Sequence, residues 1–304
     1  MNSNIYWPVY KNIESEFNNL MFAIHIDDFQ LNVYSSKITD LILRSSTEIE
    51  SLSKELYKLY EGTKINNIRY DEDALHYLNS LWNLEDKIVL ISSYNCFVTK
   101  KEVRPFLKTE KRTGSQRLTY TWNNAYQNLK HDRGNSINFG NIKYLIDVTC
   151  ALFLLNVYYK DVVYDLNDNS SGSNFDDSLG STIYSIKLHV NSGVSGSELY
   201  NKNSDFSECT YLLKATDETH FEFQQVISKI RNETAERTRN ESFKVIEQNL
   251  DLYKDLVSLT PEIKEIVEKA NTKSIISVAQ KNGKLLSEKF KSLKYHSVLN
   301  KNQY

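Results

Sequence analysis

The residues best suited to chemistry lie in the octapeptide YQNLKHDR, residues 126–133, which sets a lysine, a histidine, an aspartate and an arginine side by side. A histidine that titrates near neutrality can act as a general acid or base. Lysine and arginine can stabilise charge that develops on a phosphate. We therefore predict His131, Lys130 and Arg133 as catalytic residues, with the Asn128 amide orienting a ribose or phosphate. These groups suffice for metal-independent RNA cleavage, in which the 2′-hydroxyl attacks the adjacent phosphorus.

The same octapeptide has a purely structural interpretation. Lys130, His131 and Arg133 fall at the end of a predicted helix from about Thr119 to His131, and Gly134 follows as a stop. Positive side chains in a last turn complement the negative end of the helix dipole. On a helical wheel, an apolar stripe through Trp122, Ala125, Tyr126 and Leu129 lies opposite Asn124, Gln127, Asn128 and His131. The catalytic and capping interpretations both stay open, and both predict that His131 is not a core histidine.

A second group of candidates lies just upstream, in the loop TKKEVRPFLKTEKRTGSQR, which has a clear excess of lysine and arginine. Such a loop gives sequence-independent affinity for a nucleic-acid backbone. The predicted substrate-binding residues are Asn124, Lys101, Arg104, Lys108, Lys111, Arg112 and Arg117.

The composition is that of a soluble globular protein of 304 residues, with a net charge of −2. A near-neutral chain gives no general reason to expect nucleic acid, so anion binding must come from local patches. The three cysteines are far apart and form neither a zinc motif nor a disulfide framework. Asp165, Asn167 and Asn169 lack the glycine and the closing glutamate of a calcium loop. The sequence calls for no metal and no cofactor.

Few prolines and glycines favour long helices, so we predict a mainly α protein. Helical spacing predicts one helix from Pro8 and a second from a Ser35 or Ser36 cap to Tyr60. Three more are predicted over 71–87, 119–131 and 141–159, and the last is apolar on nearly every side and should be central. The segment KIVLISSYNCFV is left undecided between helix and strand. No apolar signal-peptide core or membrane-spanning run is seen, so we expect a cytoplasmic protein without a membrane.

The pattern changes after a polar, Gly/Ser-rich stretch at 165–181, which we predict to be a linker or long loop. In TIYSIKLHV, Tyr184, Ile186, Leu188 and Val190 alternate with polar residues, which predicts a half-buried strand with His189 on its polar face. Further strands are predicted at CTYLLKA and HFEF, with turns at Gly193 and Gly196. From about Phe223 the sequence is helical again, and its lysine-rich end from Lys269 is predicted to be a solvated helix or an anion-binding arm.

Three segments together carry a family resemblance: VYSSKITDLILRSSTEIESLSKEL, WNNAYQNLKHDR and FGNIKYLIDVTCALFLLNVYY. Over residues 6–160 the chain resembles the HEPN superfamily, and in particular a bacterial HEPN-like group with the signature W-x-x-A-Y-x-x-x-K-H-D-R. The resemblance implies an N-terminal helical bundle, a homodimer and, in many members, an endoribonuclease without a catalytic metal. The superfamily's catalytic arginine precedes the histidine by four to six intervening residues, and here those positions hold Asn124, Ala125 and Tyr126. The resemblance therefore implies that Lys130, Arg133 or a residue of a second protomer takes the arginine's role.

The expected architecture is a HEPN-like helical domain at 1–164, the linker at 165–181, and an α+β region at 182–304 with a few strands and C-terminal helices. The expected function is a metal-independent endoribonuclease, as a bacterial toxin or antiphage-defence effector, with RNA as partner. The C-terminal region would sense a trigger, regulate the site or bind a protein partner. One alternative is a non-catalytic RNA- or nucleotide-binding module, and another is a protein–protein adaptor in a defence complex.

Overall fold

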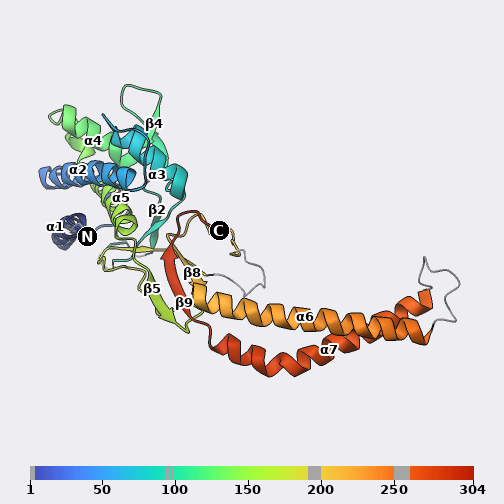
Figure 1. Cartoon of the computed structure of the whole chain (residues 1–304). Helices are drawn as coiled ribbons and strands as arrows, with labels where there is room; N and C mark the ends of the chain where they lie inside the picture. The colour runs from blue at the N-terminus through green and yellow to red at the C-terminus, as the bar shows by residue number, and fades with distance from the viewer. Residues whose placement is uncertain (1–3, 94–95, 98, 191–199, 250–260) are drawn as a thin grey trace.

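The computed structural model describes residues 4–93, 96–97, 99–190, 200–249 and 261–304. Helices make up 54 % of it and several small sheets complete it, so the protein is mainly α with a few strands, as the composition predicts. Figure 1 shows a body that contains the N-terminal helices and the sheets, and a long two-helix arm that projects from it.

The body is built around helix α5, which packs against three other helices. Its principal helices are α1 (Tyr6–Ala23), α2 (Ser36–Leu59), α3 (Leu75–Trp82), α4 (Thr121–His131) and α5 (Ile142–Lys160). Helix α5 contacts α1, α2 and α4, and its side chains are buried on nearly every side, so the predicted central position is confirmed. Within the described residues, α5 alone is long and apolar enough to cross a membrane, and 78 % of its apolar 18-residue stretch is buried inside this fold.

Most predicted helix boundaries lie within two residues of those in the structure, and side-chain caps set two of them. The Ser35 side chain accepts a hydrogen bond from the Ile38 amide at the start of α2, as predicted, and Asn141 caps α5 in the same way. The third helix differs from its prediction over 71–87. It opens with a turn of π-helix, η1 (Tyr70–Ala74), and ends at Trp82, because Asn83 adopts a left-handed conformation with φ 51°.

Strands form three small sheets. The first has the order β2-β1-β6, made of Lys101–Val103, Val89–Ile91 and Tyr184–Ile186, so the undecided segment KIVLISSYNCFV contains a strand. The second is a hairpin of β3 (Lys108–Lys111) and β4 (Leu118–Tyr120). The third has the order β5-β9-β8-β7, made of Tyr164–Asn167, Tyr295–Leu299, Tyr211–Ala215 and Leu188–Val190. The β3–β4 hairpin lies at the top of the body in Figure 1, and the sheet that contains β5, β8 and β9 lies at its bottom.

Contacts between the first and second halves of the chain run across the predicted linker. Strand β1 pairs with β6 from the other side of residues 165–181, and β5, which contains the first residues of that stretch, pairs with β9 near the C-terminus. Those residues are a folded loop rather than a linker between separate bodies. Leu166 and Leu179 are buried, and the Ser181 hydroxyl forms a 2.9 Å hydrogen bond with the Tyr10 hydroxyl of α1.

The strand predicted over TIYSIKLHV is two strands, and the expected alternation stops between them. The chain leaves the first sheet after β6 and enters the third as β7, while the Lys187 carbonyl between them accepts from Thr210 and Tyr211 amides. This change of sheet rotates the side chains, so His189 is fully buried and its Nδ1 lies 2.8 Å from the Tyr200 hydroxyl. The expectation of a solvent-facing His189 is therefore wrong. The predicted turns at Gly193 and Gly196 lie outside the described residues.

The C-terminal part corrects two further predictions. The segment HFEF is not a strand, because helix α6 (Asp217–Gln248) begins at Asp217, where the Thr216 side chain caps it. The lysine-rich end is predicted to be a solvated helix. The helix, α7 (Pro261–Lys291), stops at Lys291, and the chain after it forms strand β9. Since β9 is the neighbour of β8, the helical arm is an insertion between two paired strands.

Candidate functional site

The site is organised by α4, where Asn124, Asn128 and His131 occupy the spacing i, i+4 and i+7 of one helix face. Asn124 is buried rather than exposed, because the β3–β4 hairpin covers it. Its Oδ1 accepts from the backbone amide and hydroxyl of Thr113, at 3.2 and 3.3 Å. Asn128 donates from Nδ2 to the Thr113 hydroxyl at 2.8 Å. These two amides therefore fasten the turn of the basic hairpin to the helix.

Beyond Asn124 lies a charged cluster at which the hairpin, α4 and α5 meet. The Glu110 carboxylate accepts from Asn124 Nδ2 at 3.2 Å, from Lys143 Nζ at 2.9 Å and from the Tyr144 hydroxyl at 3.4 Å. Burial, together with the nearby Glu110 charge, raises the pKa of Asp147 to about 7, although Lys143 opposes this shift. Nothing in the sequence indicated this cluster, because Glu110 lies more than thirty residues from Tyr144 and Asp147.

His131 is the last residue of α4 and is exposed. It makes no hydrogen bond or ion pair with any residue that the structure describes, so its ring nitrogens face solvent. The neighbouring Lys130 ammonium lies 5.1 Å from the Tyr126 ring centroid and 3.3 Å from its hydroxyl. The helix ends here because Asp132, not Gly134, adopts the non-helical cap conformation.

Arg133 lies beyond the helix and reaches across to α2. Its guanidinium is 2.7 Å from Asp40 Oδ1, and the two side chains are 45 % and 66 % exposed. An exposed ion pair of this kind contributes about 0–1 kcal/mol, so an incoming phosphate can displace Asp40. Arg133 therefore does not cap α4 directly, and the capping interpretation holds only for Lys130 and His131, which lie in the last turn.

The seven predicted substrate-binding residues do not form one patch. Lys101 pairs with Asp28 at 2.9 Å and Arg104 pairs with Glu208 at 2.6 Å, and neither of them lies on the hairpin. Lys111 donates to Gln116 at 2.8 Å. Lys108, Arg112 and Arg117 do converge, around a small cavity of about 20 Å³ whose other lining residues include Asp71 and Glu72. The two acids offset two of these three positive charges, so the local positive charge is smaller than the sequence suggests.

A second polar network supports the other side of α4. The Tyr70 hydroxyl, in η1, donates to Asn123 Oδ1 and accepts from Gln127 Nε2 at 3.0 Å. Burial, with a smaller effect of Asp71, raises the pKa of Tyr70 well above its usual value. This network holds α4 from the side opposite the hairpin turn, and the sequence reasoning missed both Tyr70 and Asn123.

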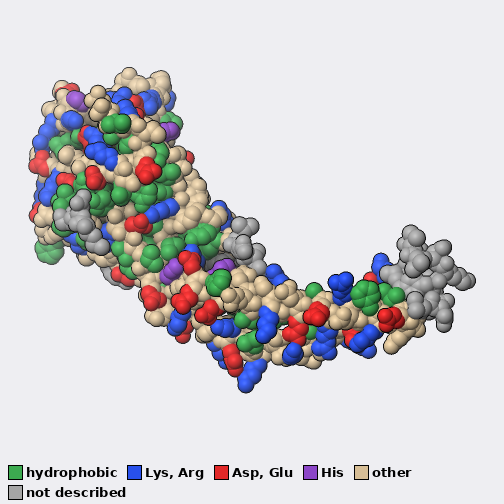
Figure 2. Space-filling view, viewed as in Figure 1, with side chains coloured by type: hydrophobic (Ala, Val, Ile, Leu, Met, Phe, Trp, Pro, Cys, Tyr) green, Lys and Arg blue, Asp and Glu red, His purple; other side chains and the backbone are tan. Residues whose placement is uncertain are grey.

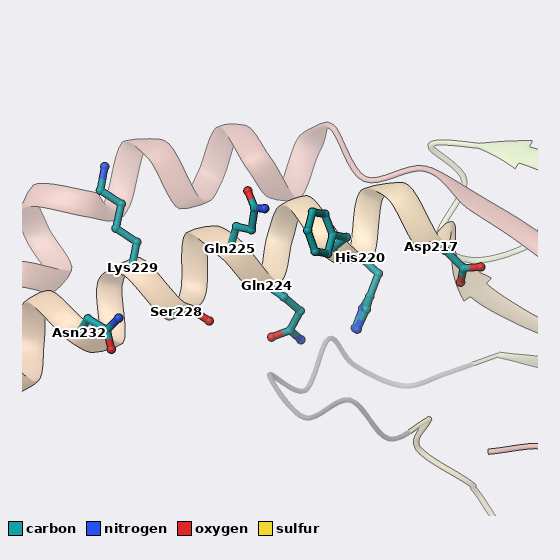
Figure 3. Close-up of a pocket in the computed structure, with 8 residues that line it drawn as sticks. Asp217, His220, Gln224, Gln225, Ser228, Lys229 and Asn232 are labelled. Carbon is teal, nitrogen blue, oxygen red and sulfur yellow. The ribbon is translucent and has the colours of Figure 1, made fainter.

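A large depression lies elsewhere, along the outer face of α6. Its volume is about 890 Å³, and its described lining residues all come from that helix, among them Asp217, His220, Phe221, Gln224, Ser228 and Asn232. Figure 3 shows His220 and Gln224 projecting to the side of α6 that faces away from α7. None of the predicted site residues contributes to it. In the described part of the chain, no cluster of three His, Cys, Asp or Glu side chains is placed to hold a metal ion.

Comparison of the chain with protein-family models, curated proteins and solved structures gives no match. The case for function therefore rests on the residues around α4. They offer an exposed imidazole, two flanking cations and a basic hairpin anchored to the same helix.

Proposed function

We propose that this protein is a metal-independent endoribonuclease of the HEPN type that acts as a bacterial toxin or antiphage-defence effector. One observation carries the proposal. The bonds from Asn124 and Asn128 to Thr113 hold the basic hairpin on the helix that ends in His131. An RNA backbone lying along this edge would meet the hairpin cations first and the exposed imidazole next.

In the proposed reaction, neutral His131 takes the proton of a ribose 2′-hydroxyl as that oxygen attacks the adjacent phosphorus. The bond from phosphorus to the 5′-oxygen breaks, and the departing oxygen takes a proton from an acid or from water. Lys130 and Arg133 stabilise the charge on the non-bridging oxygens, the role that the superfamily gives to an arginine upstream of the histidine. The products carry a 2′,3′-cyclic phosphate and a 5′-hydroxyl. Asn128 acts by positioning the hairpin, since its amide is already bonded to Thr113 and to the Asn124 carbonyl.

The test is cleavage of structured tRNA and of unstructured RNA by purified wild type and His131→Ala, with a chelator present and product ends mapped. His76→Ala is the matched control, because His76 is an exposed histidine on another helix. Cleavage by wild type and His76→Ala, but not by His131→Ala, supports the proposal when all three proteins have the same circular dichroism spectrum. Equal cleavage by all three removes His131 as the catalyst.

A non-catalytic RNA- or nucleotide-binding module is the second candidate. The convergence of Lys108, Arg112 and Arg117 favours it, because three cations in one place would contact an RNA backbone without needing His131, even with Arg117 paired to Glu72. This candidate predicts that charge-neutralising variants of the hairpin weaken RNA binding in steps and reduce its salt dependence. It also predicts that no RNA is cut by any variant.

A further inference from the structure

His189 of β7 is fully buried, and both of its ring nitrogens have partners in the segment 200–206, which we call the 200–206 loop. The Nδ1 atom lies 2.8 Å from the Tyr200 hydroxyl, and the Nε2 atom lies 3.2 Å from the backbone nitrogen of Asn203. Because a backbone N–H group can only donate, Nε2 accepts this bond and carries no proton. The ring is therefore neutral, with its one proton on Nδ1.

Tyr200 connects this imidazole to the backbone of the sheet. The Nδ1–H group donates to the Tyr200 hydroxyl, whose own proton goes to the Leu213 carbonyl at 3.0 Å or to the His189 carbonyl at 3.2 Å. The Tyr200 ring lies 5.2 Å from the imidazole, and the Phe206 ring meets the imidazole edge-on at 5.4 Å. The neutral imidazole thus joins the 200–206 loop to strands β7 and β8.

A carboxylate lies beside the same ring nitrogen. Asp205 Oδ1 is 3.6 Å from Nε2, slightly too far for a hydrogen bond, and the Asp205 side chain is 51 % exposed. A protonated imidazole carries an N–H group on each nitrogen. The new N–H group on Nε2 would point at the Asn203 N–H group, so the bond between these two atoms is lost. Asp205 is then the acceptor within reach.

Among the described residues, the neighbouring strands pair no other carboxylate with this imidazole. Leu212 lies opposite His189 in β8, and the next charged residue of that strand, Lys214, pairs with Asp217 at 3.0 Å. One strand further, His296 of β9 lies opposite Lys214. The charges on β8 and its neighbour are therefore engaged with each other or lie farther along the sheet.

The loop and the residues just after it bring the remaining titratable groups. Lys202 Nζ lies 4.7 Å from the Phe206 ring centroid. The Cys209 thiol lies 3.7 Å from Asp205 Oδ2, and burial, with a smaller effect of Asp205, raises the pKa of this thiol to about 12. The thiol therefore stays neutral, and Asp205 is the group that a protonated His189 would bind.

We propose that the 200–206 loop is an acid-sensitive clasp on the sheet. At neutral pH His189 holds Tyr200 and Asn203, and protonation of the ring transfers its Nε2 bond from the Asn203 amide to the Asp205 carboxylate. Burial lowers the pKa of His189, and the Asp205 charge opposes this shift. The clasped loop therefore binds the proton more weakly than a released loop does. The clasp is stable above about pH 6.5 and weakens as the pH falls below that value.

The clasp reaches the root of the arm through Tyr200. The Tyr200 ring lies 5.6 Å from the Tyr304 ring, and the Tyr304 hydroxyl accepts from Lys214 Nζ at 2.6 Å. Lys214 also pairs with Asp217, the first residue of α6. Figure 2 shows histidine and charged side chains together where the arm meets the body. Release of Tyr200 therefore removes a packing contact from the group that fixes the start of the arm.

The first experiment measures the protonation of His189 in the wild-type protein, by long-range 1H–15N correlation NMR of the imidazole rings from pH 8 to pH 5. Loss of one ring signal in His189→Gln assigns the residue. We expect the proton on Nδ1 alone at pH 8, and protons on both nitrogens only below about pH 6.5. A ring with its proton on Nε2 at pH 8, or a ring that is doubly protonated at pH 7, overturns the proposal.

The second experiment measures amide hydrogen exchange at pH 7.5 and pH 5, corrected for the intrinsic exchange rates. Wild type should lose protection over the 200–206 loop several-fold at pH 5, while α5 stays protected. The amide of His189→Gln can accept from Asn203 and donate to Tyr200 but does not titrate, so its loop protection should not change with pH. His76→Gln, which replaces an exposed histidine, is the matched control and should behave as wild type. Unchanged protection in wild type, or an equal loss in His189→Gln, overturns the proposal.

Asp205→Asn tests the second partner of the ring. Without the carboxylate, burial alone acts on His189, so the loop should lose protection at a lower pH than in wild type. Loss at the same pH overturns the transfer to Asp205. In wild type, residues 217–220 should lose protection together with the loop. A loop that opens while this first turn of α6 stays unchanged removes the link to the arm.

Discussion

Asn128 of α4 donates a 2.8 Å hydrogen bond to the hydroxyl of Thr113, at the turn of the β3–β4 hairpin fifteen residues upstream. Asn124 accepts from the same threonine one helical turn away, so two amides on α4 hold a single residue of the hairpin. The β3–β4 hairpin, which the sequence predicts to be a basic loop, is in this way fixed against the helix that carries His131. The position of the cations relative to the imidazole depends on this contact.

Replacement of Asn128 by alanine should release the hairpin turn without unfolding the body. It removes the bond to Thr113 and should cost about 1 kcal/mol, the usual net contribution of one hydrogen bond. Amide hydrogen exchange should accelerate over residues 108–120 and stay unchanged over α5. Asn135→Ala is the control, since Asn135 is exposed and its side chain bonds only to Asp132 among described residues. Equal exchange in both variants would contradict the anchoring role.

Glu14 should be one of the most sensitive positions in the body. Its side chain is 2 % exposed and accepts hydrogen bonds from Tyr10 at 2.8 Å and the Thr182 amide at 2.9 Å, besides contacts with Lys11 and Ser181. Replacement by alanine leaves those donors unpaired between α1 and the 180–182 loop. We expect a loss of about 3 kcal/mol, measured by urea unfolding. A loss below 1 kcal/mol would mean that the loop finds other partners.

The same carboxylate predicts acid sensitivity. Burial raises the pKa of Glu14, but hydrogen bonds from Lys11, Ser181 and Tyr10 outweigh it and hold the pKa below the usual range. A carboxyl with a depressed folded pKa stabilises the fold above its unfolded pKa, and that stabilisation is lost as the pH falls through the folded pKa. Wild type should therefore lose stability below about pH 4 more steeply than Glu14→Gln. If the unfolding free energies of the two proteins fall at the same rate as the pH is lowered, Glu14 is not the cause of the acid sensitivity.

Asp147 should show the opposite pH dependence. Burial and the neighbouring Glu110 raise its pKa to about 7, so the folded state binds its proton more tightly than the unfolded chain does. The protein therefore loses stability as the pH rises from about 4 to 7. At pH 8 the free energy of unfolding of Asp147→Asn should exceed that of wild type by on the order of 1–2 kcal/mol. Near pH 4 the two free energies should be equal. A variant that is less stable at pH 8 would contradict this electrostatic cost.

Lys87 is a buried cation whose effect should appear at alkaline pH. Its side chain is fully buried and donates to the Ser207 carbonyl at 2.7 Å, and burial lowers its pKa to about 8, with Cys209 and Asp86 opposing the shift. Between pH 8 and 10.5 the unfolded state holds the proton and the folded state does not, so stability rises with pH. Between pH 7 and pH 10, the unfolding free energy of wild type should rise by about 2–3 kcal/mol relative to that of Lys87→Met. A constant difference would show that Lys87 stays charged in the fold.

Helices and their caps could be predicted from the sequence because they depend on neighbouring residues. The Ser35 cap of α2, the apolar surface of α5 and the exposed His131 at the end of α4 all follow from local spacing. Local rules failed where backbone conformation or sheet membership changed within a few residues. Asn83 ends α3 early, and the passage from β6 to β7 at Lys187 turns His189 into the core.

For the proposed site, the sequence alone made His131, Lys130, Arg133 and a basic segment the candidates, because these are residue types with known chemistry. Their partners were decided only by tertiary structure. Arg133 bonds to Asp40, Asn124 lies beneath the hairpin against Glu110, and Lys101 and Arg104 pair with acids away from the hairpin. Spacing along a chain fixes which side chains share a helix face. The pairing of charges depends instead on which distant segments the apolar core brings together, and no local pattern encodes that.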